Sequence, residues 1–377
     1  MYIKRALEEV IKGQLFKGKV IVLYGPRQAG KTTLVKRVVE DVSAPVRFVD
    51  CELLANNELL TRRNTEEIFS FVQGYRIVVF DEAQTVKGIG SVLKSLIDHH
   101  PETQYIATGS SSFDLVNEVS EPLTGRSREY VLYPLGLTEL VDRSFDAENR
   151  LGEFMRFGGY PGIQAMTEEE KKQELQTLVS QYLYKNVLSL DGFRKPELVV
   201  SLIKLLAFQI GHEVSYRELS QTLGTSIATV QKYIGLLEQN FVLLRIGAYA
   251  RIGRKEVVRS KKIYFIDTGL RNALVNNFAP MQITARPDVG VLFENIMIVE
   301  RFKHLAHHGQ VSPKHFFWRT VDQQEIDYLE EQDGKLKAFE FKWGKAEARV
   351  PKVFFGHYPE ASFETVNQKN AYAFLTQ

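Results

Sequence analysis

The chain has little of what marks secreted or membrane-embedded proteins. Its 377 residues contain a single cysteine, Cys51, which excludes a disulfide within the chain and fits a reducing compartment. No apolar run approaches the roughly 18–20 residues of a membrane-spanning helix, and the charged, amphipathic first residues lack the apolar core of a signal peptide. We therefore expect a soluble, cytoplasmic protein with no membrane partner.

A large charge of one sign is also missing. The 48 Lys and Arg residues nearly balance the 46 Asp and Glu residues, which leaves a formal net charge of +2 at pH 7. Any nucleic-acid surface must therefore be a local patch and not a field over the whole protein. The composition, 44% hydrophobic and 25% charged, is ordinary for a globular protein, and the length allows about two to four domains.

The most informative stretch joins an apolar segment, Val20–Leu23, to a glycine-rich turn. Residues 25–32 read GPRQAGKT, a complete GxxxxGK[ST] pattern, and a helix-forming run follows over 33–42. Strand, loop and helix in this order form a P-loop, whose backbone N–H groups and helix N-terminus bind phosphates. We expect an ATP or GTP site with Mg²⁺, lined by Gly25, Pro26, Arg27, Gln28, Ala29, Gly30, Lys31, Thr32 and Thr33.

Two side chains of the loop carry chemistry, and a second motif completes it. We expect Lys31 to reach the β- and γ-phosphates and the Thr32 hydroxyl to hold Mg²⁺. About fifty residues further on, an apolar segment ends in Asp81 and Glu82, the Walker B pattern. Asp81 is expected to hold the Mg²⁺ shell, and Glu82 to polarise the attacking water. Without the P-loop, a helix N-cap with a first-turn acid would explain the pair equally well.

Residues 1–145 alternate strand and helix patterns, which predicts an α/β domain with a mainly parallel sheet and helices on both faces. The expected strands are 20–23, 46–50, 77–80, 105–107 and 129–132.

Two later features of this domain have open interpretations. Small polar residues follow the fourth strand, so Ser110 or Ser111 is a candidate sensor of the γ-phosphate or of the water, although turn chemistry explains them as well. Arg126 stands on a predicted loop, where it is either an arginine finger supplied to a neighbouring subunit or a solvated surface residue.

These motifs together resemble a known group. GPRQAGKTTL, the VVFDEAQ strand end, TGSSS, LTGR and FGGYPG at 157–162 are similar to a group of prokaryotic AAA-type ATPases. In that group a P-loop domain precedes a C-terminal domain of uncertain function that is related to restriction endonucleases. The resemblance spans nearly the whole chain, and it implies this organisation here.

The middle of the chain is predicted to be helical. Residues 146–196 fit a helical lid interrupted by the glycine turn at 158–162. Over 197–270, a capping box at Ser215, a glycine turn and a second helix with the stripe Ile227, Val230, Ile234 and Leu237 predict a winged helix-turn-helix. Its wing is basic and suited to DNA phosphates, through Arg245, Arg251, Arg254, Lys255, Arg259, Lys261 and Lys262. The second helix offers few base-reading side chains, so we expect contact without sequence specificity.

Residues 325–343 predict a β-hairpin that turns at Asp333 and Gly334. Counting outward from this turn, Asp327 faces Glu340 and residue 325 faces residue 342. Their side chains share one face of the hairpin. The other face is expected to be core, formed by Ile326, Tyr328, Phe339 and Phe341.

Opposed carboxylates repel one another unless a cation lies between them. Asp327, Glu340 and Lys342 match the D…ExK core of the PD-(D/E)xK nuclease fold, which the resemblance also implies, although Ile326 stands in place of the proline of that name. Glu294, on an expected helix over 291–302, fits a further metal-binding acid. In that chemistry the metal activates water, which Lys342 would position with Glu340 as a catalytic group. The alternative is an amphipathic hairpin in which Lys342 pairs with residue 325.

Three histidines near the end of that helix, at 304, 307 and 308, have no zinc-ligand spacing, so we expect a polar helix end. The expected fold class is therefore α/β: a P-loop NTPase sheet, a helical lid, a winged-helix middle domain and a C-terminal α/β restriction-endonuclease-like domain over 271–377.

We expect an ATP-hydrolysing AAA-type enzyme that acts on DNA, as a homo-oligomer that shares Arg126. The alternative is a nucleotide-gated switch whose C-terminal domain docks a protein partner. Glu82 favours hydrolysis, because pure switches often lack such a water-activating acid.

Overall fold

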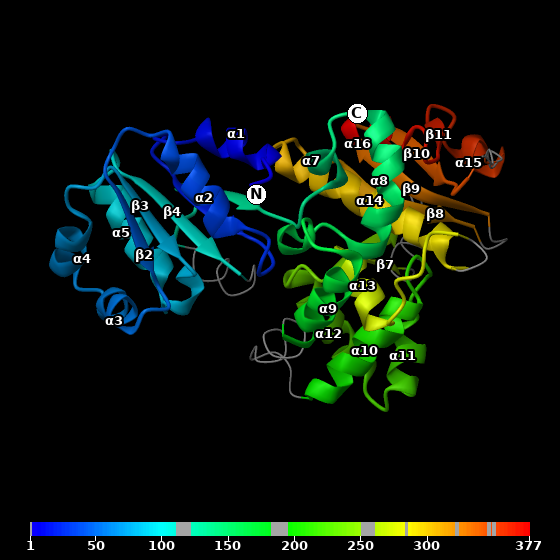
Figure 1. The fold of residues 1–377 in the computed structure, drawn as a ribbon, viewed down its shortest axis with the longest axis horizontal. Coiled ribbons are helices and arrows are strands. Elements are labelled where there is room, and N and C mark those ends of the chain that lie inside the picture. Colours follow the sequence, from blue (N-terminus) through cyan, green and yellow to red (C-terminus); the bar gives the residue numbers. More distant parts are fainter. Residues whose placement is uncertain are drawn as a thin grey trace.

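The computed structural model describes residues 2–110, 122–181, 195–249, 261–282, 286–320, 324–344, 348 and 352–377. Ser111 and the centre of the expected basic wing, with Arg251, Arg254, Lys255 and Arg259, lie outside the described residues. The chain forms two lobes: an amino-terminal lobe, blue to cyan in Figure 1, and a carboxyl lobe that holds the later elements. No helix of the described residues is both long and apolar enough to cross a membrane.

The amino-terminal lobe is built on a five-stranded sheet with the order β2-β3-β4-β1-β5, and all its strand pairs are parallel. This confirms the predicted parallel sheet, and each strand lies within two residues of its expected position. The strands are β1 Val20–Tyr24, β2 Val46–Asp50, β3 Ile77–Asp81, β4 Gln104–Gly109 and β5 Ser127–Val131.

Helices cover both faces of this sheet because β1, which lies between β4 and β5, is apolar on both sides. Val20 and Val22 of β1 contact one apolar cluster, under α3, α4 and α5, whereas Ile21 and Leu23 contact a second cluster, under α1 and α2. Alternating side chains of a strand point to opposite faces, so an unbroken apolar run needs two covering layers. The helices are α1 Ala6–Lys12, α2 Lys31–Glu40, α3 Leu54–Arg62, α4 Thr65–Val72 and α5 Ile89–His99, with a short 3₁₀ helix η1 Ala83–Thr85.

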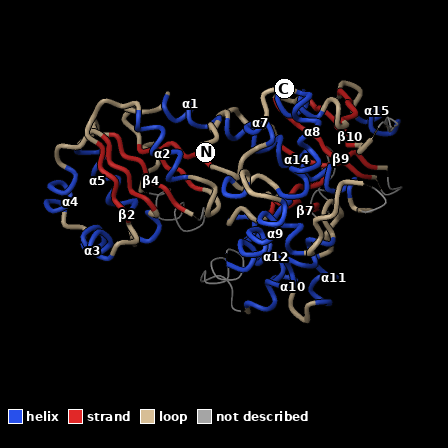
Figure 2. The backbone as a smooth tube through the Cα atoms, in the orientation of Figure 1, coloured by secondary structure: helices blue, strands red, loops and turns tan. Residues whose placement is uncertain are grey.

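The carboxyl lobe contains a second sheet, with the order β11-β10-β9-β8-β6-β7; Figure 2 shows the two sheets as separate groups of red strands. Its strands are β6 Leu243–Ala248, β7 Lys261–Phe265, β8 Lys314–Arg319, β9 Glu325–Gln332, β10 Lys335–Phe341 and β11 Ser362–Val366. Because β6 and β7 belong to the same sheet as β8–β11, the sheet crosses the expected domain limit between residues 270 and 271.

Helices pack around this second sheet, and all but the one that holds Phe354 share one apolar core with residues from Tyr133 to Leu375. Phe354 belongs to a separate cluster. The helices are α7 Leu137–Leu140, α8 Ser144–Phe157, α9 Glu168–Leu178, α10 Pro196–Phe208, α11 Tyr216–Thr222, α12 Ile227–Gln239, α13 Thr268–Leu274, α14 Val289–His307, α15 Lys352–His357 and α16 Ala371–Thr376, with a 3₁₀ turn η2 Pro161–Ile163. The largest of these helices, α14, passes through the middle of the lobe in Figure 1.

Helices α11 and α12 have the expected helix-turn-helix connection. The Ser215 hydroxyl accepts a hydrogen bond from the Glu218 N–H at 3.2 Å, and Gly224 turns the chain with φ 60°. The expected apolar stripe is wrong at one position, because Ile227 is 44% exposed. Tyr233, which lies one turn beyond Val230, is buried and completes the stripe instead.

The glycine turn that follows α8 is a point of close approach between segments. A Cβ on Gly159 would overlap the carbonyl oxygen of Leu135, and a Cβ on Gly158 would overlap the Asp267 carboxylate. The Gly159 N–H donates to Asp267 at 2.8 Å, and its carbonyl accepts from the Leu135 N–H at 2.7 Å. Glycine is therefore required here because two segments pack against the bare backbone.

Candidate functional site: the P-loop and two groups of buried charges

The P-loop lies where the sequence places it, between β1 and α2. A Cβ on Gly25 would overlap the Leu132 carbonyl oxygen, and Gly30 has φ 95°, so both glycines are needed by the backbone. Pro26 and Ala29 are buried beneath the loop. Three other expected site residues, Arg27, Gln28 and Thr33, are exposed at its rim.

Lys31 is held inside the loop. Its side-chain ammonium donates to the carbonyl oxygens of Gly25, at 3.0 Å, and Pro26, at 3.1 Å, and the residue is 5% exposed. Burial lowers the pKa of Lys31 to about 8, against the opposing effect of the Glu82 and Asp81 carboxylates. A phosphate beside it would favour the protonated form, so the loop is arranged to gain from binding an anion.

The predicted magnesium-binding residues, Thr32 and Asp81, are neighbours. The Thr32 hydroxyl lies 2.9 and 3.1 Å from the two Asp81 carboxylate oxygens. A further hydroxyl, that of Thr108 at the end of β4, donates to the same carboxylate. A hydroxyl beside a carboxylate is the donor set that Mg²⁺ takes together with phosphate oxygens and waters, so these residues fit the expected ion.

Glu82 is joined to the end of β4 through side chains. Its backbone N–H donates to the Thr108 hydroxyl at 3.2 Å, and its carboxylate accepts from the Gln84 amide at 2.6 Å. The same amide nitrogen lies 3.1 Å from the Ser110 hydroxyl. Ser110 is therefore connected to Glu82 through Gln84, and its role as a sensor stays a prediction. The sequence analysis missed Thr108 and Gln84, although both lie within the TGSSS and DEAQ segments that it singled out.

Arg126 lies at the amino ends of the strands, whereas the P-loop lies at their carboxyl ends. It immediately precedes β5, which is parallel to β1, so it is about 16 Å from the loop, the length of a five-residue strand. Its side chain is 42% exposed and pairs with Asp98 at 2.6 Å. Arg126 therefore does not belong to the site of its own subunit.

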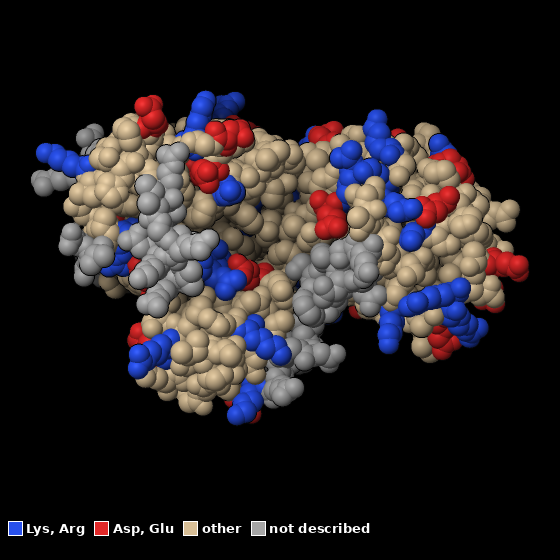
Figure 3. Space-filling view, turned by 180° about the vertical axis from the view of Figure 1, so that it is seen from behind, with Lys and Arg blue, Asp and Glu red and all other residues tan. Residues whose placement is uncertain are grey.

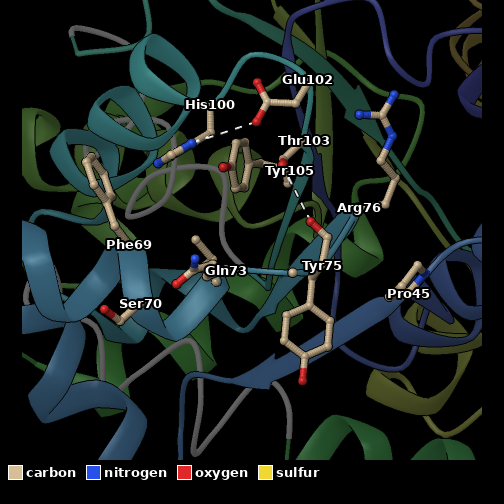
Figure 4. Close-up of a pocket in the computed structure, with 12 residues that line it drawn as sticks. Pro45, Phe69, Ser70, Gln73, Tyr75, Arg76, His100, Glu102, Thr103 and Tyr105 are labelled. Carbon is tan, nitrogen blue, oxygen red and sulfur yellow. Dashed lines mark hydrogen bonds and ion pairs between the residues drawn. The ribbon is translucent and has the colours of Figure 1, made fainter.

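A cavity of about 690 Å³ lies at the same end of the sheet as Arg126, beside the amino ends of β2, β3 and β4. Figure 4 shows the aromatic rings of Phe69, Tyr75 and Tyr105 around it, with His100 and Glu102 joined by an ion pair. The cavity and the P-loop are separated by the length of the strands, so it is not part of the nucleotide site.

Arg5 joins the P-loop to the carboxyl lobe. Its guanidinium donates to the carbonyl oxygens of Ala29 in the loop, at 2.9 Å, and Tyr133, at 2.7 Å. It also pairs with Glu139 in α7 at 3.1 Å, and Arg5 is 3% exposed. All three contacts are therefore made in a buried site, where charged hydrogen bonds are strong.

Glu139 extends this link to α14. Its second carboxylate oxygen lies 3.4 Å from Nδ1 of His307, whose Nε2 accepts from the Tyr133 N–H at 3.1 Å. Burial works against the charged form, but His307 and Arg5 hold the pKa of Glu139 well below its usual range. The expectation of a polar helix end is wrong for His307, which is 1% exposed. We call Arg5, Glu139 and His307 the lobe link.

The predicted hairpin is present, with one difference on its core side. Its pairing from Lys335 opposite Gln332 to Phe339 opposite Tyr328 is the predicted register. However, two steps along β8 correspond to three along β9, so β9 carries an extra residue before Leu329. The prediction that Ile326 shares a face with Tyr328 is wrong for this reason: Ile326 packs with Leu329 in a separate cluster.

Asp327 lies in this irregular segment, near the two other expected metal-binding acids. Its carboxylate accepts from the Phe341 N–H at 2.8 Å. Burial, with the nearby charges of Glu294 and Glu340, raises the pKa of Asp327 well above its usual value. The fold therefore brings Glu294, Asp327 and Glu340 within electrostatic reach of one another.

Two of these acids, Glu294 and Glu340, are already paired with protein cations. Lys262 lies 2.9 Å from Glu294 and 2.5 Å from Glu325, whereas Lys342 lies 2.6 Å from Glu340 and not beside Glu325. Within the described ranges, no group of three or more His, Cys, Asp or Glu side chains is placed to hold a metal ion. The three acids thus form a charged cluster whose present arrangement is not that of a metal site.

Two of the expected wing residues that the structure describes are already engaged by carboxylates. Lys262 is 2% exposed, and Arg245 pairs with Glu238 at 2.7 Å. The prediction of a phosphate contact is wrong for Lys262, because its ammonium is buried among carboxylates.

Residues 17–141 match the family described as an AAA domain. The amino-terminal lobe is an AAA-type P-loop domain. Residues 148–281 and 289–372 match two families that are each described as a domain of unknown function, DUF8612 and DUF4143.

Relatives that match most of the chain occur in bacteria and archaea. An uncharacterized protein of Mycobacterium tuberculosis is 29% identical over 335 residues, covering 88% of this chain and 72% of the relative. An uncharacterized protein of Methanocaldococcus jannaschii is 23% identical over 348 residues, with 86% and 75% covered. Among solved structures, the Walker-type ATPase of Pyrococcus abyssi has a TM-score of 0.51 and 15% identity, over 73% of this chain and 96% of that one. That likeness shows a shared fold.

The lobe link predicts a measurable coupling between its charges. Arg5→Met should destabilise the chain by about 3–5 kcal/mol, because it leaves the Glu139 carboxylate buried without the guanidinium that pairs with it. Adding Glu139→Gln should restore part of that loss. Urea denaturation of the two single variants and the double variant measures the coupling, with Arg37→Met, which removes an exposed pair with Glu40, as the control. Additive effects of Arg5→Met and Glu139→Gln would contradict the link.

Proposed function

We propose that the chain is a Mg²⁺-dependent ATPase whose nucleotide state is passed to a carboxyl lobe that acts on DNA. The observation that carries the proposal is the convergence of four side chains at the carboxyl ends of β1 and β3: Lys31, Thr32, Asp81 and Glu82. Each has the chemistry that triphosphate hydrolysis needs, and the sheet edge at which they meet is where parallel sheets bind ligands.

The roles follow from the contacts. The backbone N–H groups of the loop and the Lys31 ammonium bind the phosphates, while Thr32 and Asp81 hold the metal ion. Mg²⁺ supplies charge that stabilises the leaving phosphate oxygens. The Glu82 carboxylate orients the attacking water. Two of these groups, Asp81 and Glu82, are fixed to β4 through the Thr108 hydroxyl, so the catalytic acids are held before nucleotide arrives.

Two substitutions separate binding from hydrolysis. Lys31→Ala should remove both, because the loop loses its cation. Glu82→Gln should keep MgATP binding and lower kcat by about 10²–10⁴-fold, the usual contribution of a positioned base. Calorimetric binding of MgATP and a phosphate-release assay on the same preparations test this. Full turnover by the Lys31→Ala chain would refute the proposal.

We also propose that Arg126 completes the site of a neighbouring subunit in a homo-oligomer. Arg126 lies at the end of its own sheet that is away from the P-loop. Its partner Asp98 is a surface residue, so Arg126 can be released from this pair. An arginine that reaches the phosphates from another subunit stabilises the charge of the transition state.

This proposal predicts activity from two inactive chains. Arg126→Ala and Lys31→Ala should each hydrolyse ATP at a small fraction of the wild-type rate. Mixed together, they should recover activity, because an intact P-loop of one chain meets an intact Arg126 of the other. The measurement is phosphate release against mixing ratio, with Arg128→Ala, which removes an exposed arginine of the adjoining strand β5, as the control. A mixture no more active than its components would place Arg126 outside catalysis.

Helices α10–α12 and the first two strands of the second sheet support a DNA-contacting role. Helices α10, α11 and α12, a single bridge between Glu213 and Lys262, and the hairpin β6–β7 follow one another in the order of a winged helix. The face seen in Figure 3 carries Lys and Arg side chains interspersed with Asp and Glu. Contact with DNA would therefore be local and without sequence specificity.

A second candidate function concerns the carboxyl-terminal acids. The sequence α14, β8, β9, β10, α15, β11, with β10 parallel to β11, carries Glu294, Asp327 and Glu340 close together, and the raised pKa of Asp327 favours a cation there. As a nuclease, this cluster would bind a divalent ion only after Lys262 releases Glu294. Lys342 would then position the water. As a docking domain, it would keep Lys262 as its permanent internal cation.

One experiment separates these outcomes. If the cluster is a nuclease, the wild type should cut plasmid or branched DNA with Mn²⁺, and Glu340→Ala should not. If it is a docking domain, the wild type should neither cut nor gain thermal stability with Mn²⁺, whereas Lys262→Met, which frees Glu294, should gain it. Glu331→Ala, on the same hairpin away from the cluster, is the control. Cutting that persists in Glu340→Ala would exclude this site as its source.

A further inference from the structure

We propose that Gln84 is a positioning residue of the hydrolytic site, which fixes the Glu82 carboxylate and offers the attacking water a second acceptor. The inference rests on the ATPase function proposed above. Gln84 belongs to η1, the short 3₁₀ helix that directly follows Glu82.

The Gln84 amide can be oriented in only one way. Its nitrogen lies 2.6 Å from a Glu82 carboxylate oxygen and 3.1 Å from the Ser110 hydroxyl. An amide has two N–H donors and one carbonyl acceptor. Rotating it by half a turn would set its carbonyl against the Glu82 carboxylate, where two acceptors repel. The contacts therefore direct both donors to Glu82 and Ser110.

This orientation leaves the amide oxygen of Gln84 with an unusual environment. The oxygen is buried, and among the described residues it has no hydrogen-bond partner. A buried acceptor without a donor costs about 1–3 kcal/mol, so such an atom is retained where it has a task. It belongs to the same planar amide that touches Glu82, and it therefore lies beside the carboxylate that is to hold the attacking water.

A water has two hydrogens, and orienting it requires two acceptors. The Glu82 carboxylate takes the hydrogen that leaves during attack, and the Gln84 oxygen takes the other. The lone pair of the water oxygen is then directed away from both, toward the P-loop. Fixing a reactant in this way raises kcat, because less orientation has to be gained in the transition state.

Ser110 gives the amide a connection to β4. The ring of contacts runs from Asp81 through the Thr108 hydroxyl to Glu82, then through Gln84 to Ser110. Residues 108 and 110 belong to the same strand end, so this strand end holds Glu82 at two points, its backbone N–H through Thr108 and its carboxylate through Gln84 and Ser110. Glu82 itself has φ 51°, a conformation that non-glycine residues seldom adopt and that such a brace maintains.

The test uses Gln84→Met, which keeps the volume of the side chain and removes both donors and the acceptor. We expect kcat for ATP to fall by 10- to 100-fold, while KM and the calorimetric affinity for MgADP change less than twofold. Gln73 lines the cavity at the opposite end of the same sheet. Gln73→Met is therefore the matched control, and this variant should hydrolyse ATP at the wild-type rate.

A double-mutant cycle distinguishes positioning from loss of structure. If Gln84 acts through Glu82, then Gln84→Met should have no further effect on single-turnover hydrolysis in the Glu82→Gln background. Equal losses in both backgrounds, or a wild-type kcat for Gln84→Met, would overturn the inference while the ATPase proposal stands. A wild-type chain that binds MgATP without hydrolysing it would overturn both.

Discussion

The guanidinium of Arg5 holds the P-loop against the carboxyl lobe through three buried contacts. It bonds to the P-loop carbonyl of Ala29, to the Tyr133 carbonyl beyond β5 and to the Glu139 carboxylate of α7. A charged group buried this deeply is stable only while its partners stay in place. The P-loop, the segment that leaves the first sheet and the first helix of the carboxyl lobe are thus held at a single point, and through His307 that point reaches α14.

This arrangement explains how a small displacement at the nucleotide site could be transmitted to the carboxyl lobe. Ala29 directly precedes Gly30, so if the P-loop closes on phosphates, as proposed, the carbonyl that Arg5 holds would move with it. Helix α14 carries His307 at its end and Glu294 near its start, so one continuous helix connects the lobe link to the carboxylate cluster. A helix that is almost wholly buried transmits displacement because its neighbours cannot be compressed.

Local patterns predicted much of the fold and of the nucleotide site. A few adjacent residues are enough to predict the P-loop, the Walker B acids and each of the five parallel strands. The register of the β9–β10 hairpin is also predicted locally, because its turn determines it. What escaped prediction depends on contacts between distant residues. Arg5 meets residues 29, 133 and 139, and Lys262 meets acids at 294 and 325. The extra residue in β9 arises from its pairing with β8, so no property of the hairpin reveals it.

The membership of β6 and β7 in the same sheet as β9 and β10 has a mechanical consequence. Helix α12 leads directly into β6, and the strand pairing from β7 to β10 is continuous through β6, β8 and β9. Helices α11 and α12 therefore cannot change their distance from the acids at 294, 327 and 340 without breaking a strand pair. If the carboxyl lobe contacts a DNA duplex, as proposed, helices α11 and α12 and the acid cluster would contact it at a fixed spacing. Nucleotide could shift the position of the lobe along the duplex, but the number of base pairs between the two contacts would stay the same.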